Sequence, residues 1–207
     1  MAGRTKVAEI RITFRYGPAM RRASTLGVRL TQRLRELLPI PPAKGRNVIR
    51  DAWNLLSGMP GGKVVFSRLV GRMAPYTGSI HATVTVLRAG YAEVQMADRK
   101  PVRNHLDCVH AVALANLGEL AGNVALAYSL PDDARFIVSG MEIEYTKKAR
   151  GTITAIGEPP VPRTSVRAQY DVPVSLRDAS GDEVAKVILH SLVGPKPGSA
   201  GDRGDVN

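Results

Sequence analysis

Several kinds of residue are scarce in this 207-residue chain, and each shortage excludes a class of protein. A single cysteine, Cys108, cannot form an internal disulfide and excludes a zinc site built from a cysteine cluster. It favours a reducing, cytoplasmic setting. No stretch approaches about 18 uninterrupted apolar residues, which argues against a membrane-spanning helix. Arginines interrupt every apolar run near the N-terminus, which argues against a signal peptide.

Acidic residues are also scarce, but only in the first quarter of the chain. Residues 1–50 hold twelve of the 29 basic residues and two of the 18 acidic ones, which leaves 17 basic and 16 acidic residues in the remainder. The net charge of +11 therefore belongs to an N-terminal arm, residues 1–46, and the body is close to neutral. Such an arm can contact nucleic acid or an anionic membrane, or it can be an extension without a partner.

Helical periodicity is present in the arm and directly after it. Leucines recur at helical spacing over Leu26–Leu37 with arginines between them, which predicts an amphipathic helix that ends at the prolines of residues 39–42. Two short apolar stretches, Val48–Leu56 and Val64–Met73, are separated by a glycine- and proline-rich turn and also read as helices. We assign them to a helical cap segment, residues 47–74.

In residues 75–194 the hydrophobic period changes to two, which is typical of strands. A hairpin with a glycine-containing turn at 88–91 precedes one long helix, Asp107–Ser129, for which we predict Asp107 as N-cap and Pro131 as terminator. The predicted strands cover 83–87, 92–96, 136–145, 151–157, 165–176 and 183–193. Strands on both sides of one long helix predict an α+β domain with an antiparallel sheet packed on that helix. Residues 195–207 form a tail that we predict to be disordered.

The long helix is apolar on nearly every side, so it must be covered on most sides, and a second subunit is the simplest cover. Gly118 and Gly122 each cost roughly 1 kcal/mol relative to alanine, which indicates that a neighbouring backbone approaches closely. A thin polar stripe contains Asn116, Glu119 and Asn123. A carboxylate in such a helix is costly to bury without a partner or a task. Glu119 is therefore either a functional acid or a carboxylate on the one wet face.

The start of the helix offers hydrogen-bond donors and three polar side chains. Its free N–H groups favour negative charge and can hold the oxyanion of an acyl-transfer intermediate. His110 either supports a site or is a packed histidine, and Asn104 either holds a carbonyl or a water or forms a turn. Cys108 is a candidate nucleophile because a helix N-terminus lowers the pKa of a thiol, although a packed cysteine is commoner.

The spacing of Asn104, five residues, His110, eight residues and Glu119 resembles the hotdog-fold acyl-CoA thioesterase superfamily. Its phenylacetate-type members carry an N-x5-H-G-G helix entry and an acidic residue at the same interval. The segment 143–151 is similar to the strand that follows in those proteins, and residues 104–119 are most similar to a poorly characterised branch. The resemblance covers roughly residues 47–193. Ala111-Val112 replaces the family's Gly-Gly, and Lys148 replaces the proline before Ala149.

The resemblance implies a hotdog fold, an antiparallel sheet wrapped around one central helix, in a homodimer or dimer of dimers whose sheets join. The active sites would lie at the subunit interface, with no metal and no cofactor. Glu119 would be the general base or the nucleophile, and the Ala111 N–H would polarise the thioester carbonyl. Asn104 would position the water or the carbonyl, and His110 would support the turn. The implied substrate-binding residues are Asn116, Lys147, Lys148 and Arg150, the last three meeting the phosphates of coenzyme A (CoA).

The leading hypothesis is an acyl-CoA thioesterase that releases a free acid and CoA. A hydratase that uses His105 and Asp107 is an alternative on the same fold, although the rest of its motif is absent. From a different class comes a non-enzymatic acyl-CoA-binding or scaffold protein that is tethered to a membrane or nucleic acid through residues 1–46. The body lacks the interleaved basic and aromatic residues of single-strand binders, so only the arm favours tethering.

Overall fold

The computed structural model describes residues 9–13 and 46–198. Within them, seven strands form one sheet of order β1-β4-β7-β6-β5-β3-β2, and every neighbouring pair is antiparallel. The strands are β1 (Glu9–Thr13), β2 (Thr83–Arg88), β3 (Tyr91–Met96), β4 (Ala134–Tyr145), β5 (Ile153–Gly157), β6 (Ala168–Arg177) and β7 (Glu183–Pro195). The predicted strands of residues 83–193 are confirmed, with ends shifted by up to three residues. The predicted arm helix and residues 199–207 of the tail lie outside the described residues.

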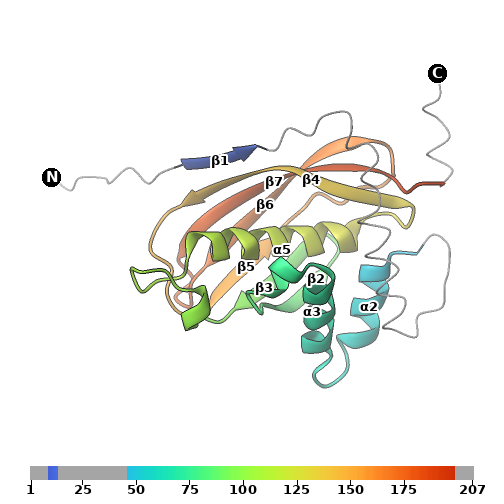
Figure 1. The fold of residues 1–207 in the computed structure, drawn as a ribbon. Coiled ribbons are helices and arrows are strands. Elements are labelled where there is room, and N and C mark those ends of the chain that lie inside the picture. Colours follow the sequence, from blue (N-terminus) through green and yellow to red (C-terminus); the bar gives the residue numbers. More distant parts are fainter. Residues whose placement is uncertain (1–8, 14–45, 199–207) are drawn as a thin grey trace.

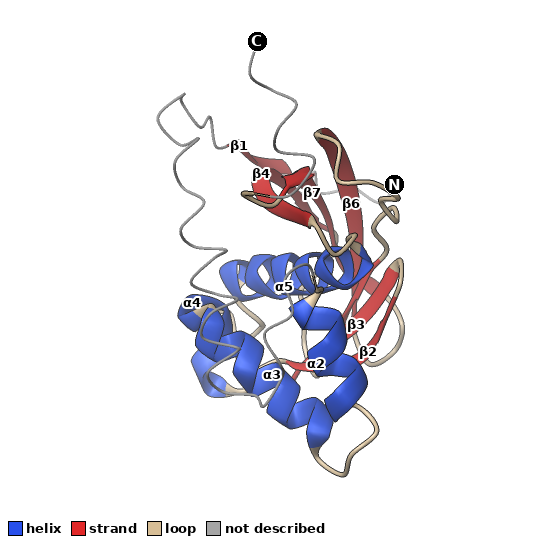
Figure 2. Ribbon diagram, turned by 90° about the vertical axis from the view of Figure 1, so that its right-hand side faces the viewer, coloured by secondary structure: helices blue, strands red, loops and turns tan. Residues whose placement is uncertain are grey.

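The helices lie on one side of this sheet (Figures 1 and 2). They are α2 (Val48–Leu56), α3 (Gly62–Met73), α4 (Pro75–Gly78), the short 3-10 turn η2 (Lys100–Val102) and α5 (Ala111–Ser129). The curved sheet wraps around α5, which packs against strands from β2 to β7, while α2 and α4 contact α5 from outside the sheet. The α+β class with one wrapped central helix is confirmed, and it is the hotdog fold.

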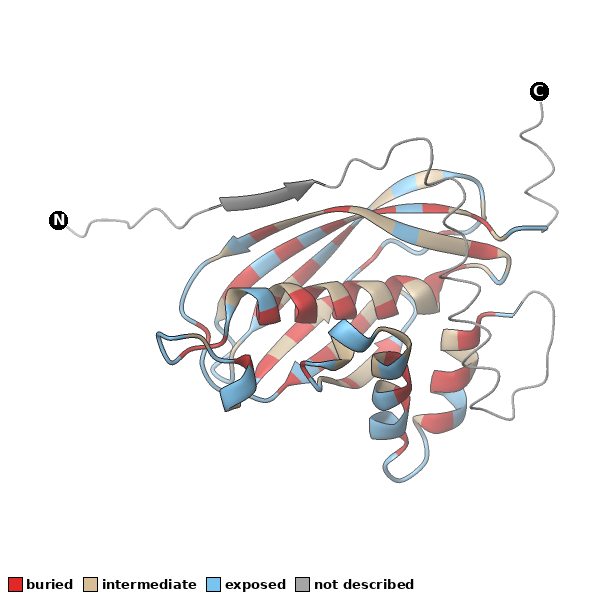
Figure 3. Cartoon of the chain, viewed as in Figure 1, coloured by how far each residue is buried: buried red, intermediate tan, exposed pale blue. Residues whose placement is uncertain are grey.

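The chain's own helices cover part of α5 on the side away from the sheet. The structure places α2 and α4 there. The second subunit that we expected as a cover stays a prediction. The helix is long and apolar enough to cross a membrane, but 61% of its most apolar stretch is buried inside the fold. Figure 3 shows the same pattern, with buried residues along most of α5 and alternating burial along the strands. The apolar sequence of α5 therefore matches a core helix.

Glycines set the distance between α5 and the sheet. A Cβ added to Gly122 would lie 2.5 Å from Leu189 Cδ1, and one added to Gly118 would lie 2.8 Å from Val187 Cγ2. At the mid-helix glycines it is therefore mainly side chains of the sheet that approach closely. A neighbouring backbone does come close at Gly157 of β5, whose added Cβ would lie 2.9 Å from the Ala121 carbonyl oxygen. These positions let the sheet wrap tightly around the helix.

The start of α5 differs from the prediction. The helix begins at Ala111, and His110 is its N-cap, with the His110 Nδ1 accepting a hydrogen bond from the Val112 N–H at 3.1 Å. Asp107 lies in the preceding loop with a positive φ of 52°, so the prediction of Asp107 as N-cap was wrong. An isolated bridge between Arg103 and Val109 closes that loop, and an extended residue 109 cannot belong to a helix that starts at 107.

One side chain ties the helical cap to the end of α5. Asn47 is the N-cap of α2, and its Oδ1 accepts a hydrogen bond from the Arg50 N–H at 3.0 Å. Its Nδ2 donates to the carbonyls of Ala127 at 2.7 Å and Leu130 at 3.1 Å, where α5 ends. The same amide therefore closes the first turn of one helix and the last turn of another.

Candidate active site

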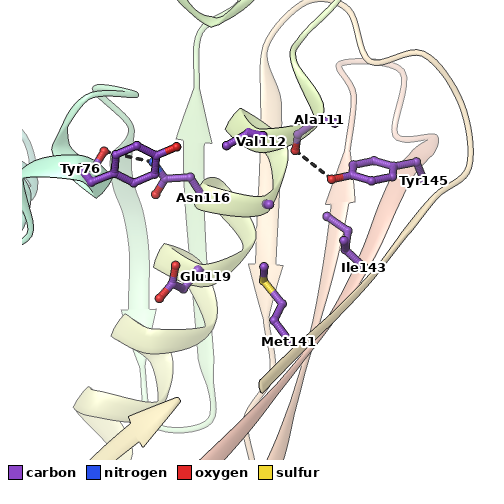
Figure 4. Close-up of a pocket in the computed structure, with 9 residues that line it drawn as sticks. Tyr76, Ala111, Val112, Asn116, Glu119, Met141, Ile143 and Tyr145 are labelled. Carbon is purple, nitrogen blue, oxygen red and sulfur yellow. Dashed lines mark hydrogen bonds between the residues drawn. The ribbon is translucent and has the colours of Figure 1, made fainter. Parts of the chain in front are cut away.

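A cavity of about 260 Å³ opens between the first half of α5, the inner face of β4 and the short helix α4 (Figure 4). Its lining is mostly apolar, and Glu119 is the one carboxylate in it. The lining residues are Tyr76, Ala111, Val112, Ala115, Asn116, Glu119, Met141, Ile143 and Tyr145. The helical stripe around Asn116 and Glu119 therefore faces a cavity and not open solvent. Alternation along β4 turns every second side chain from Met141 to Tyr145 towards it.

Glu119 is partly buried in this apolar lining. Burial raises the pKa of its carboxyl because the charged form loses hydration, and a hydrogen bond with the Asn123 side chain partly lowers it again. A carboxylate with a raised pKa is a stronger base than one in water. Its position beside a cleft therefore fits a group that accepts a proton.

Asparagines lie on both sides of Glu119 along α5. Asn116 is only 5% exposed, and its Nδ2 donates to the Tyr76 carbonyl oxygen at 3.1 Å. The Oδ1 atoms of both Asn116 and Asn123 are buried and have no hydrogen-bond partner among the described residues. Figure 4 shows the side chains of Asn116 and Glu119 on the same side of the helix. Of these two residues only Asn116 lines the cavity, so the lining includes one amide oxygen with unused capacity to accept a hydrogen bond.

Donor capacity comes from the first turn of α5. The Val112 N–H is bonded to the His110 side chain and the Ala113 N–H to the His110 carbonyl oxygen, whereas the Ala111 N–H has no partner among the described residues. Tyr145 Oη donates to the Ala111 carbonyl oxygen at 3.0 Å and so fixes this turn against β4. Burial raises the pKa of the Tyr145 hydroxyl, so it remains a donor at neutral pH.

The other two predicted catalytic residues do not line the cavity. The exposed His110 caps the helix through its Nδ1. Asn104 Oδ1 accepts hydrogen bonds from the Leu106 N–H at 2.9 Å and from the Cys108 Sγ at 3.3 Å. Both side chains therefore shape the loop that leads into α5. The role of Asn104 across a subunit interface, which the resemblance implies, stays a prediction.

The predicted CoA-binding cations lie on the segment that follows β4. Lys147 Nζ forms ion pairs with Asp178 at 2.7 Å and Asp182 at 2.6 Å, which direct it towards the β6–β7 turn. Those hydrogen bonds raise the pKa of the lysine. Lys148 and Arg150 are exposed. A hydrogen bond of 2.9 Å from the Val109 N–H to the Ala149 carbonyl oxygen holds this segment beside the entry to α5.

The geometry weakens two alternative readings. Cys108 is buried, its thiol faces Asn104, and it does not line the cavity, so it is poorly placed as a nucleophile. His105 and Asp107, the pair of the hydratase reading, are exposed on the loop. The described residues contain no group of three or more His, Cys, Asp or Glu side chains arranged to hold a metal ion.

Sequence reasoning did not find the part of the lining that comes from outside α5. Tyr76, Met141 and Tyr145 reach the cavity through tertiary packing. The period of two along β4 was the available signal for Met141. For Tyr145, the last residue of β4, the signal was the resemblance of segment 143–151 to the family. Tyr76 lies in the segment 75–80, which is also similar to the poorly characterised branch, but nothing in that segment indicates that its side chain lines a cavity.

Comparison with known proteins agrees with the fold. The antiparallel sheet wrapped around one central helix is the hotdog fold, and a cleft lies beside that helix. The chain belongs to the family described as domain of unknown function DUF4442, whose model matches residues 62–193. No curated protein matches the chain significantly.

Solved structures with the same fold are similar over most of the domain. A structural-genomics crystal structure is 31% identical, with 71% of this chain and 98% of that chain covered and a TM-score of 0.62. A protein from Pseudomonas aeruginosa, described as a probable thioesterase, is 21% identical, with 66% and 97% covered and a TM-score of 0.58. A thioesterase from Haemophilus influenzae is 13% identical, with 59% and 84% covered and a TM-score of 0.53.

Proposed function

We propose that this protein is a thioesterase that hydrolyses an acyl-CoA to the free acid and CoA, with Glu119 as the catalytic carboxylate. One observation carries the proposal: the carboxylate is partly desolvated in an apolar cavity that Ala111 also lines, and the Ala111 N–H has no partner among the described residues. The fold and the thioesterases among the similar structures support the reaction class. The apolar lining suits an acyl chain.

The reaction needs a base, an oxyanion donor and a leaving thiolate. With Glu119 as general base, a water proton moves to the carboxylate while the water oxygen bonds to the thioester carbon. The carbonyl electron pair moves to its oxygen, which the Ala111 N–H stabilises. On collapse the C–S bond breaks, the electron pair leaves with sulfur, and the proton passes from Glu119 to the thiolate. With Glu119 as nucleophile, its carboxylate oxygen bonds to the thioester carbon, the C–S bond breaks and the CoA thiolate leaves. Water then hydrolyses the resulting mixed anhydride to the free acid and the regenerated carboxylate.

The CoA moiety would lie outside the cavity mouth. Lys148 and Arg150 are the exposed cations on the segment beside the entry to α5, and we propose that they contact its phosphates. Lys147 is less suited because two aspartates hold it. Val112 and Tyr76, 49% and 69% exposed, lie at the mouth, where a second chain of a homodimer would close the cavity.

A screen of acyl-CoA thioesters from acetyl to palmitoyl, with phenylacetyl-CoA included, tests this function through the release of free thiol. We expect turnover for at least one chain length and a loss on the order of 1,000-fold in Glu119→Gln, because the amide cannot accept the water proton. Glu158→Gln, at an exposed carboxylate that does not line the cavity, is the matched control and should keep full activity. Equal turnover of Glu119→Gln and the unmodified protein would remove Glu119 from the mechanism.

One observation favours a second candidate function, that of an acyl-CoA-binding protein without rapid hydrolysis. The side chain of Val112 lines the cavity at a position where the family pattern has glycine, so a thioester approaches the first turn of α5 less closely. This alternative predicts that calorimetry detects saturable binding of an acyl-CoA and that no free thiol is released. Its tethering arm lies mostly outside the described residues.

A further inference from the structure

The unused acceptor of Asn116 is the feature that the proposed function leaves unexplained. The side chain is 5% exposed, its Nδ2 is anchored to the Tyr76 carbonyl oxygen, and its Oδ1 has no partner among the described residues. An unsatisfied buried acceptor costs about 1–3 kcal/mol. Because the anchored Nδ2 fixes the orientation of the amide, the Oδ1 cannot turn away to find a partner. The group therefore fits a bound molecule that donates a hydrogen bond.

The position of Asn116 relative to Glu119 limits what that molecule is. Residues three apart on a helix have Cβ atoms about 5–6 Å apart on one face. In Figure 4 the Asn116 oxygen lies on the side of its amide that faces Glu119. A single water oxygen forms two hydrogen bonds of about 2.8 Å each, so it can bridge both side chains once a small side-chain movement opens the buried Asn116 Oδ1 to the cavity.

The chemistry of the two groups sets the orientation of the water. An ionised carboxylate and an amide oxygen only accept hydrogen bonds, so the molecule between them has to supply two donors. A water that donates one hydrogen to each has both lone pairs directed away from the helix stripe, into the apolar cavity. That is the orientation needed for attack on a carbonyl carbon polarised by the Ala111 N–H.

We propose that Asn116 is a second catalytic residue, which holds the hydrolytic water together with Glu119 and aims its lone pair at the thioester. This assignment rests on the proposed hydrolysis and gives Asn116 a role on the water, where the resemblance gave it one on the substrate. It also favours Glu119 as general base, because the base is then already hydrogen-bonded to the nucleophile. The Tyr76 carbonyl has a positioning role, since it fixes the amide.

The test uses the full chain with Asn116→Leu, which has nearly the same volume and no polar side-chain atom. The substrate is the acyl-CoA that the unmodified protein hydrolyses fastest, and the matched control is Asn54→Leu, an exposed asparagine that accepts a hydrogen bond from Tyr128 Oη far from the cavity. We expect kcat of Asn116→Leu to fall on the order of 100-fold, as for a misplaced reactant. The Kd of the corresponding thioether analogue, measured by calorimetry, should stay within about twofold, and Asn54→Leu should match the unmodified protein.

Two results would overturn the assignment. An unchanged kcat would show that the water needs no second acceptor. A weakened Kd with kcat retained would show that Asn116 binds an N–H group of the substrate. Folding of Asn116→Leu is checked by its thermal transition. If it does not fold, Asn116→Ser takes its place, and its kcat should also fall because the shorter serine side chain moves the acceptor oxygen away from the water. Absence of turnover in the unmodified protein would overturn the proposed function itself, which separates the two failures.

Discussion

Asn123 lies one turn beyond Glu119 and donates the hydrogen bond that keeps the pKa of the carboxyl from rising further. In Asn123→Leu the burial of Glu119 remains and the donor is lost, so the pKa should rise. A general base works only when it is ionised, so kcat falls as the pH drops through this pKa. We expect the acid limb of the pH–kcat profile to move to higher pH in Asn123→Leu, with the plateau at high pH retained.

The matched control for this profile is Tyr128→Phe on the same helix, which removes the hydrogen bond to Asn54 at the end away from the cavity. Its profile should overlay that of the unmodified protein. An acid limb in Asn123→Leu that does not move, or that moves to lower pH, contradicts the role assigned to this side chain. In both proteins the limb should lie above the ordinary carboxyl pKa of about 4.3 because burial raises the pKa of Glu119.

At the scale of single residues, helical periodicity predicted that Asn116 and Glu119 share a face, and both line the cavity. Asn123 of the same predicted stripe does not line it, and the role of Ala111 was implied only by the resemblance. Tyr145 bonds to Ala111 across 34 residues of sequence, and no local pattern specifies such a contact. The ion pairs of Lys147 were equally out of reach, since they depend on how the β6–β7 turn folds back.

Among the elements, α5 and the sheet are packed most closely at Gly122. An added Cβ would meet Leu189 Cδ1 at 2.5 Å and the side chains of Val172 and Val174 at 3.1 Å. Gly122→Ala gains about 1 kcal/mol of helix propensity, but overpacking a filled core typically costs about 1–3 kcal/mol. We expect the clash to dominate and Tm to fall by a few degrees.

The control for Gly122→Ala is Gly58→Ala, where an added Cβ meets no atom within 4 Å. Its Tm, measured by differential scanning calorimetry, should change little. A higher Tm in Gly122→Ala would show that the helix and the sheet can separate to admit a methyl group, and that the glycine does not set their spacing.

The order and type of the main elements from α2 to β7 could be predicted because strand and helix periods differ, but β1, α4 and some boundaries could not. Both Asp107 and His110 can accept a hydrogen bond from a helix N–H, so residue type alone does not choose between them. The Arg103–Val109 bridge decides, since it keeps residue 109 extended. Arg103 also pairs with Asp98 at 2.7 Å and with Asp107 at 2.8 Å. These contacts engage Asp107 in the loop and leave the cap to His110.

For the whole molecule, strand β1 of the N-terminal arm covers an edge of the sheet. It pairs with β4 from Glu9–Glu144 to Thr13–Gly140. The resemblance implies a dimer in which two sheets join, and joining at the β4 edge requires β1 to leave. Deletion of residues 1–45 exposes that edge, and exposed edge strands pair with other chains. We expect the truncated chain to have a larger mass in solution than the full chain at equal concentration, measured by light scattering.

Strand pairing and loss of basic charge can be separated with the full-length variant Arg11→Pro/Ile12→Pro. Successive N–H groups of a strand point in opposite directions, so one of the two prolines removes a hydrogen bond to β4. This variant should also form larger oligomers than the unmodified protein if the exposed edge is the cause. The same number of chains per particle in all three proteins would contradict a protective role for β1.

Asn47 couples parts of the molecule that the sequence keeps 80 residues apart. Its amide closes the start of α2 and the end of α5 together, so detachment of α2 deprives the last turn of α5 of its partners. Glu119 lies on that same helix, roughly three turns earlier. Opening of α2 therefore also breaks hydrogen bonds at the end of α5. Local unfolding that begins at residues 47–56 would propagate along α5 towards the carboxylate, so this distant amide helps to keep the proposed base in place.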